Sequence, residues 1–315
     1  MKSKMSIQEL IDGIRNDGAG KTRFAGQLMS LAEQSSESLV EILSRLSGAP
    51  LPRIILGITG APGSGKSVLT GRIIEAFRAK YPERMIGVIA IDPSSPFTGG
   101  AILGDRIRMM QHSCDSNVFI RSLATHGQIG GVTEGTRGVI SVMGLLGCDV
   151  VLVETVGVGQ MEFAVRDIVD IVTVVLAPGQ GDTIQFLKAG LMEIGDLFVM
   201  NKADRPDSVS FYAQLTHALL LSHQENRPVL KVSARDNIGI FELFQTVEDF
   251  YSRDFGKWKF VRQEKLLLLI KRIILNESLK RIEFLFRQKG QEKAIQEISE
   301  GSKTLSSVVD DLLQK

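Results

Sequence analysis

The residues best suited to chemistry form one glycine-rich stretch, Gly60-Ala61-Pro62-Gly63-Ser64-Gly65-Lys66-Ser67, which fits the phosphate-binding pattern G-x-x-x-x-G-K-[ST]. An apolar segment, 54–59, precedes it, and 68–80 carries apolar residues at helical spacing, so a chance glycine loop is a poor explanation. A strand, a glycine loop and a helix in this order aim backbone N–H groups at a phosphate. We expect Lys66 to reach the β- and γ-phosphates of a nucleotide and the Ser67 hydroxyl to hold Mg²⁺.

Three carboxylates follow apolar segments and are candidates for magnesium binding or catalysis. Asp92 ends the segment 85–91, Asp105 follows Gly104, and Glu154 ends the segment 149–153. Asp92 and Asp105 could hold Mg²⁺ or orient the attacking water, or they could merely cap a turn and a helix. An apolar strand that ends in a carboxylate is typical of the second half of a P-loop nucleoside triphosphatase site.

Glu154 begins the pattern Glu154-x-x-Gly157, in which the Gly157 N–H could contact the γ-phosphate. Val158 stands where Ras-like enzymes carry the glutamine that orients water, and Gln160 lies two residues further on. The sequence therefore predicts slow hydrolysis in the absence of a partner.

A second motif, Asn201-Lys202-Ala203-Asp204, follows the apolar segment 196–200 and predicts a guanine-binding site. The Asp204 carboxylate can accept hydrogen bonds from guanine N1–H and the 2-amino group, whereas adenine offers no such pair of donors. Asn201 would support the loop, and the Lys202 stem would cover the base. A further segment, 229–232, leads into a loop whose backbone N–H groups could meet the guanine carbonyl: Ser233, Ala234 and Arg235.

Weaker signals have ordinary structural explanations. His126 could be a catalytic or signalling residue, but a loop histidine that is hydrogen-bonded to backbone is the favoured interpretation. His112 with Cys114 makes a poor metal site because no further ligands cluster with them. A glycine-rich loop near Gly179 could be a mobile element, although Asp182 could simply cap the helix that follows it.

The composition is that of a globular protein with balanced charge. The 315 residues include 37 basic and 36 acidic side chains, which implies neither a nucleic-acid partner nor an anionic membrane surface. Two cysteines without a C-x-x-C pair suit a reducing compartment, and the chain start lacks the features of a signal peptide. The most apolar run, 266–270, is too short to span a bilayer, so we expect a soluble cytoplasmic protein.

Alternating strands and helices between 51 and 252 predict an α/β fold with a doubly wound, mainly parallel sheet. Its expected strands are 54–59, 85–91, 118–123, 149–153, 171–176, 196–200 and 229–232. Residues 1–50 are expected to form a helical arm, with one apolar stripe at its start and another over 24–46. Residues 253–315 predict a C-terminal helical extension, with a long helix over 258–286 whose apolar face either packs on the same chain or forms a dimer.

Taken together, the motifs resemble the MeaB / methylmalonic aciduria type A family, which is also known as ArgK or LAO/AO transport kinase. The similarity is dense over about 50–240, and the string Glu154-Thr155-Val156-Gly157-Val158-Gly159-Gln160 is its most distinctive part. Asp92-Pro93-Ser94-Ser95, Gly104-Asp105-Arg106 and Ala124-Thr125-His126-Gly127 also match the family. Val68 departs from the family's usual threonine, and Pro96-Phe97 replaces polar residues.

The resemblance implies a GTPase of the SIMIBI class, with a P-loop core and helical extensions. It implies a GTP-dependent chaperone of an adenosylcobalamin-dependent acyl-CoA mutase, chiefly methylmalonyl-CoA mutase, and a homodimer formed through the extensions. By the same resemblance, Gly60 to Val68 bind phosphates, Asp204 and Ser233 to Arg235 bind guanine, and Ser67, Asp92, Asp105 and Glu154 surround Mg²⁺. A third switch that signals to the mutase would contain Asp182, Gln185 and Lys188.

Three other functions share parts of this pattern. A small-molecule or protein kinase would need a phospho-acceptor pocket, and a metal-insertion GTPase of the hydrogenase or urease maturation type would need clustered histidine and cysteine ligands. A GTP-regulated binding module would not hydrolyse the nucleotide, whereas Lys66, Ser67 and Glu154 favour hydrolysis.

Overall fold

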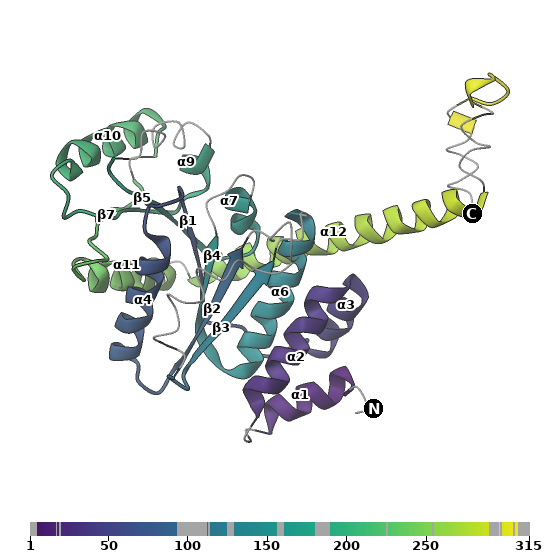
Figure 1. Cartoon of the computed structure of the whole chain (residues 1–315), viewed down its shortest axis with the longest axis horizontal. Helices are drawn as coiled ribbons and strands as arrows, with labels where there is room; N and C mark the ends of the chain where they lie inside the picture. Colours follow the sequence, from purple (N-terminus) through teal and green to yellow (C-terminus); the bar gives the residue numbers. More distant parts are fainter. Residues whose placement is uncertain are drawn as a thin grey trace. The chain divides into compact units, whose positions relative to one another are not determined.

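Figure 1 shows the computed structural model of the chain. The residues that it describes are 5–16, 18, 20–92, 112, 114–124, 129–155, 161–179, 190–224, 226–253, 255–289, 296, 298–304 and 306–307. By its internal contacts the chain divides into two units, Met1–Lys265 and Leu266–Lys315.

Seven parallel strands form one sheet in the order β3-β2-β4-β1-β5-β6-β7. Their bounds are β1 Ile54–Thr59, β2 Met85–Asp92, β3 Val118–Ala124, β4 Cys148–Thr155, β5 Ile171–Leu176, β6 Leu197–Met200 and β7 Val229–Lys231. The central β1 pairs with β4 on one side and β5 on the other, and all of its residues are buried. The seven predicted strands and the parallel α/β class are confirmed, because strands covered on both faces carry the continuous apolar runs seen in the sequence.

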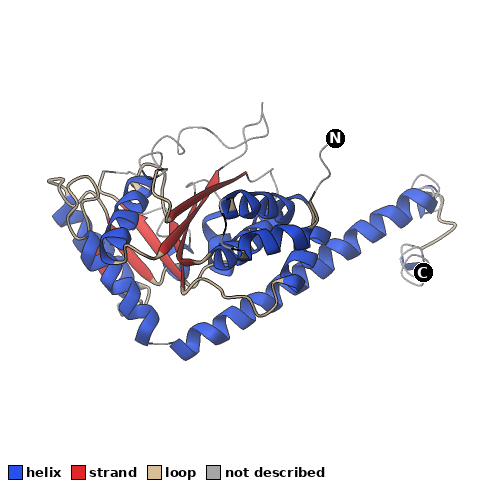
Figure 2. Cartoon of the chain, turned by 90° about the horizontal axis from the view of Figure 1, so that it is seen from below, coloured by secondary structure: helices blue, strands red, loops and turns tan. Residues whose placement is uncertain are grey.

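Helices cover both faces of the sheet (Figure 2). Within the first unit they are α1 Ile7–Arg15, α2 Lys21–Gln34, α3 Ser36–Arg45, α4 Lys66–Lys80, α6 Ile129–Leu146, α7 Met161–Ala164, the 3-10 turn η2 Val165–Asp167, α9 Met192–Ile194, α10 Ser208–Leu221 and α11 Ile240–Arg253. One core cluster joins β1 to α4 and α11 through residues such as Leu56, Phe77 and Phe244. Burying these large apolar side chains fixes the start of α4 at the carboxyl end of β1.

The N-terminal arm is helical, as predicted, and the apolar stripe over 24–46 falls on two helices, α2 and α3. Ser35 has an extended backbone conformation between α2 and α3, and its hydroxyl accepts a hydrogen bond from the Ser38 N–H at 3.1 Å. A serine that caps a helix start in this way ends the preceding helix, although the apolar stripe continues across the break. The arm packs against α6, with Leu28, Leu39 and Ile42 fully or almost fully buried.

The long helix α12, Phe255–Lys289, is slightly longer than the predicted 258–286. Its first turns belong to the first unit: Trp258 is 3% exposed, stacks on Tyr251 and donates from Nε1 to the Tyr251 carbonyl at 2.9 Å. The two contact units divide inside this helix, after Lys265. No helix in the described part of the chain is long and apolar enough to cross a membrane.

Candidate nucleotide-binding site

The glycine-rich loop lies between the end of β1 and the start of α4, as the motif requires (Figure 1). Gly60 has φ +139°, and a side chain there would bring its Cβ within 2.0 Å of the Val175 carbonyl oxygen. Gly65 has φ +90°, and its Cβ would lie 2.4 Å from Asn201 Nδ2. Both positions therefore need glycine, because the backbone conformation and the space each exclude a side chain.

Lys66 and Ser64 bring polar groups into this loop. The Lys66 ammonium donates to the carbonyl oxygens of Gly60 at 2.7 Å and Ala61 at 3.0 Å, and the residue is only 7% exposed. The Ser64 hydroxyl is buried and has no hydrogen-bond partner among the described residues. A buried hydroxyl and a buried ammonium at a helix N-terminus suit a polyanionic ligand, since both lose hydration that a phosphate can replace.

Glu154 holds two hydroxyl groups of α4. One carboxylate oxygen accepts from Ser67 Oγ at 2.6 Å and the other from Thr70 Oγ1 at 2.8 Å. Glu154 is 5% exposed and stands opposite Ile58 in the pairing of β4 with β1, so the sheet places it beside the loop. Carboxylate and hydroxyl oxygens are the ligands that Mg²⁺ prefers, and Ser67 with Glu154 would fit this ion.

Thr70 lies outside both sequence motifs. It is fully buried, and its hydroxyl also donates to the Lys66 carbonyl at 3.0 Å, within α4. Its spacing of three residues from Ser67 is the signal that could have found it, because residues three apart share one face of a helix.

Asn201 joins the two motifs. Its Nδ2 donates to the Ser64 carbonyl at 2.8 Å, and its Oδ1 accepts from the backbone N–H groups of Lys202 at 2.8 Å and Ala234 at 3.1 Å. Lys202 adds a bond from Nζ to the Gly63 carbonyl at 2.7 Å. These hydrogen bonds connect the loop after β6, the loop after β7 and the glycine-rich loop, and the bonds of Asn201 to Ser64 and Ala234 are buried.

Asp204 lies in the loop where the sequence predicts guanine recognition. Its carboxylate accepts from Ser233 Oγ at 2.8 Å and forms an ion pair with Arg235 at 3.2 Å. Arg235 is largely exposed and also pairs with Asp236, which lowers the pKa of the Asp236 carboxyl. The side chain of Asp204 keeps about a fifth of its exposure, so a ligand can reach it.

Part of the predicted site lies outside the described residues. This holds for Asp105, Gly157, Gln160, His126, Asp182, Gln185 and Lys188. Asp92 ends β2 at the same edge of the sheet as Glu154, but the description covers its backbone only. Among the described residues, no three or more histidine, cysteine, aspartate or glutamate side chains gather as a metal site would require.

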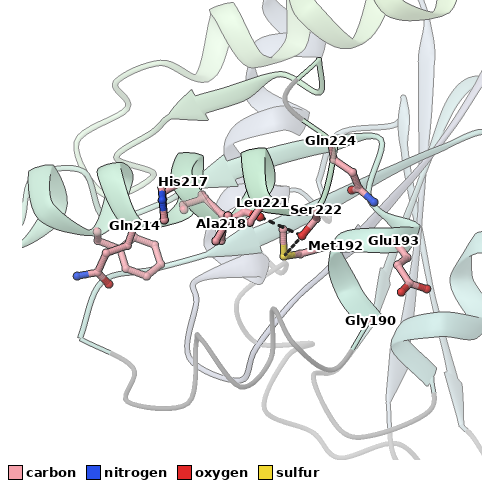
Figure 3. A pocket seen from close by; sticks show the side chains of 11 residues that line it. Gly190, Met192, Glu193, Gln214, His217, Ala218, Leu221, Ser222 and Gln224 are labelled. Carbon is pink, nitrogen blue, oxygen red and sulfur yellow. Dashed lines mark hydrogen bonds between the residues drawn. The ribbon is translucent and has the colours of Figure 1, made fainter.

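A cavity of about 620 Å³ lies away from these loops, between α9 and α10 (Figure 3). Met192 and Leu215 belong to its largely apolar lining, and Ser222 Oγ lies 3.8 Å from Met192 Sδ. None of the motif residues described above is in its lining, so the cavity is separate from the phosphate and base loops.

A parallel sheet with this loop between β1 and α4 defines a P-loop nucleotide-binding protein. The chain belongs to the family of the methylmalonyl-CoA mutase-associated GTPase MeaB, whose family model matches residues 25–284. This family is the one that the motifs in the sequence resemble.

Relatives agree with this assignment, and a solved structure shares the fold. A Pyrococcus abyssi protein is 40% identical over 98% of this chain and 96% of its own length. The GTPase ArgK of Escherichia coli is 35% identical over 81% of each chain, and the mouse mitochondrial methylmalonic aciduria type A homolog is 40% identical over 65% of this chain and 51% of its own length. The crystal structure of an LAO/AO transport system kinase covers 99% of each chain with a TM-score of 0.69 and 24% identity, which establishes the shared fold.

Proposed function

We propose that the protein binds GTP and hydrolyses it to GDP and phosphate. The observation that carries this proposal is the position of Asn201, which bonds both the glycine-rich loop and the loop after β7. A single nucleotide that spans these loops would have its phosphates at Lys66 and its base at Asp204. The names of relatives, among them GTPase ArgK, support the same chemistry.

Each predicted site residue has a defined task in this proposal. The backbone N–H groups between Gly60 and Val68, apart from Pro62, which has none, and the Lys66 ammonium bind phosphate oxygens, and Asp204 accepts hydrogen bonds from the base edge. Ser67, Asp92, Asp105 and Glu154 would hold Mg²⁺, which supplies positive charge against the phosphate oxygens. Gly157 would sense the γ-phosphate, and turnover without a partner is slow because Val158 cannot orient water.

Glu154→Gln tests the metal site. The neutral amide keeps the size of the side chain but removes the charge opposite Ser67, so Mg²⁺-dependent turnover should fall by about 100-fold or more. GDP affinity without Mg²⁺ should stay within about threefold, because the phosphate and base contacts remain. If the wild type and Glu154→Gln turn over GTP equally at every Mg²⁺ concentration, the metal binds elsewhere.

We further propose that the client is an adenosylcobalamin-dependent acyl-CoA mutase of the methylmalonyl-CoA mutase type. The family description and the mouse relative's name support it. The switch that signals to the mutase would contain Asp182, Gln185 and Lys188, and residues 253–315 would form the dimer extension.

GTP turnover by the purified protein, alone and with such a mutase, tests both parts. We expect slow turnover that rises on adding the mutase and is lost in Lys66→Ala. If Lys66→Ala abolishes GTP turnover but the mutase does not change it, the proposed GTPase activity stands and this client is excluded. Transfer of labelled γ-phosphate to an acceptor other than water would identify a kinase instead.

A further inference from the structure

Arg72 lies on α4, six residues after Lys66, and its guanidinium reaches the loop that follows β7. Its Nε donates to the Ala234 carbonyl at 3.0 Å, and Nη2 donates to the Arg235 carbonyl at 3.4 Å. On the other side, Nη1 pairs with Glu75 at 2.7 Å. The helix that begins at the phosphate loop therefore also holds the backbone of the expected base loop.

The Ala234 carbonyl shares a planar peptide unit with the Arg235 N–H. In a trans peptide these two groups point in opposite directions, so fixing the carbonyl also fixes the N–H. The Ser233 and Ala234 N–H groups donate to the Ile238 carbonyl and to Asn201 Oδ1, whereas the Arg235 N–H has no acceptor among the described residues. A cation on the carbonyl also strengthens the N–H as a donor, since hydrogen bonds along one peptide polarise each other.

We propose that Arg72 is a positioning residue for guanine: it orients the peptide between Ala234 and Arg235 so that the Arg235 N–H donates to guanine O6. This inference rests on the guanine binding proposed above and adds a residue outside the two sequence motifs. Arg72 and Asp204 then act on different atoms of the base, because Asp204 accepts from N1–H and the 2-amino group.

The planar fork of arginine explains the residue type. The three guanidinium nitrogens of Arg72 contact two neighbouring carbonyl oxygens and the Glu75 carboxylate. A lysine offers one nitrogen on a flexible stem and could not hold both carbonyls and the carboxylate in this arrangement.

Affinities for three nucleotides, measured by calorimetry, separate Arg72 from Asp204. 6-Thio-GDP keeps N1–H and the 2-amino group but carries a weaker acceptor at position 6, and IDP lacks only the 2-amino group. The wild type should prefer GDP to 6-thio-GDP by about fivefold or more. Arg72→Met, which keeps the aliphatic stem, should reduce this preference to within about twofold, while the preference for GDP over IDP stays within about twofold of the wild type.

Two variants complete the design. Glu75→Gln removes the charge of the ion pair but keeps an oxygen that can accept from Arg72 Nη1, so both carbonyl contacts persist and the variant should behave like the wild type. If Arg72→Met does not fold, Arg72→Gln, which is too short to contact both carbonyls, is measured in its place and the same loss of preference is expected.

The outcomes distinguish this inference from the proposed function. A wild type that does not prefer GDP to ADP would contradict the guanine specificity, and the inference would fall with it. A wild type that prefers guanine but binds GDP and 6-thio-GDP equally, or an Arg72 variant that keeps the wild-type preference at position 6, would overturn the inference alone.

Discussion

In the proposed function, Asp204 is the residue on which the choice of base depends. Its carboxylate already accepts from Ser233 Oγ and pairs with Arg235, and both contacts turn it toward the loop after β7. A carboxylate has several acceptor sites, so these contacts leave room for the two donors of guanine.

Asp204→Asn should change the preferred base. An amide offers a donor where guanine also has one, and it matches the carbonyl at position 2 of xanthine instead. We expect GDP affinity to fall by about 100-fold and XDP affinity to rise, as measured by calorimetry. Asp236→Asn is the matched control, because Asp236 also lies beside Ser233 and Arg235, and its GDP affinity should stay within about threefold. An unchanged ratio of GDP to XDP affinity in Asp204→Asn would remove Asp204 from base recognition.

At the scale of elements, the contact between α6 and the N-terminal arm depends on one small residue. A Cβ at Gly138 would lie 2.6 Å from Leu39 Cδ1 and 2.7 Å from Ala32 Cβ, and both neighbours are buried. Close packing of α6 against α2 and α3 therefore excludes a side chain at this position.

Gly138→Ala should lower the free energy of unfolding by about 1–3 kcal/mol, because the methyl group forces packed side chains apart. Gly26, in the interior of α2, has no heavy atom within 4 Å of a built Cβ. Gly26→Ala should therefore raise stability by up to about 1 kcal/mol, since alanine favours helix. Urea unfolding followed by circular dichroism gives both values, and equal effects of the two substitutions would contradict the close packing.

The first turns of α12 contain a lysine whose positive charge destabilises the folded state. Lys265 donates to the Val169 carbonyl, and burial lowers its pKa to about 8 from the ordinary value of 10.5, despite the opposing effect of nearby Asp170. Between these two values the unfolded chain binds a proton that the folded chain has released. The contribution of Lys265 to the free energy of unfolding is therefore lowest below its pKa in the folded state, and it increases as the pH rises through that pKa.

Between about pH 7.5 and about pH 9.5, the wild type should gain about 1–2 kcal/mol of unfolding free energy relative to Lys265→Met. The difference between the two proteins isolates Lys265 from other titrating groups. Urea unfolding at several pH values measures it. If the two proteins change in parallel, the Lys265 ammonium is solvated in the folded state.

At the scale of the whole molecule, the second contact unit presents many apolar side chains on α12. Between Leu266 and Phe284 several of them are exposed, and Ile274 and Leu275 are about 60% exposed. A helix with this much apolar surface is typical of a protein interface. This supports the proposed homodimer through the C-terminal extension.

The double substitution Ile274→Glu with Leu275→Glu should shift the protein from dimer to monomer in analytical ultracentrifugation, because it places charges in the apolar surface. Lys271→Glu changes an exposed polar position of the same helix and should leave the assembly intact. GDP affinity should be the same in all three proteins, since the proposed nucleotide-binding residues belong to the first unit. A wild type that is monomeric at tens of micromolar would argue against this dimer.

The sequence alone determined the seven strands and the location of the main motifs. Continuous apolar runs identify strands buried on both faces, and each motif follows one of them, so the carboxyl edge of a parallel sheet had to collect these residues. The family also follows from the motifs, because their order and spacing are distinctive.

Only the tertiary structure decided which residues act on one another. Asn201 donates to the Ser64 carbonyl across 137 positions of the sequence, and Arg72 donates to the Ala234 carbonyl across 162. Glu154 accepts hydrogen bonds from Ser67 and Thr70 of α4. The break between α2 and α3 at Ser35 could not be predicted from the sequence pattern, because an apolar stripe does not reveal where a cap interrupts the helix. Local spacing predicts elements and motifs, whereas contacts across the chain depend on how the sheet and its helices pack.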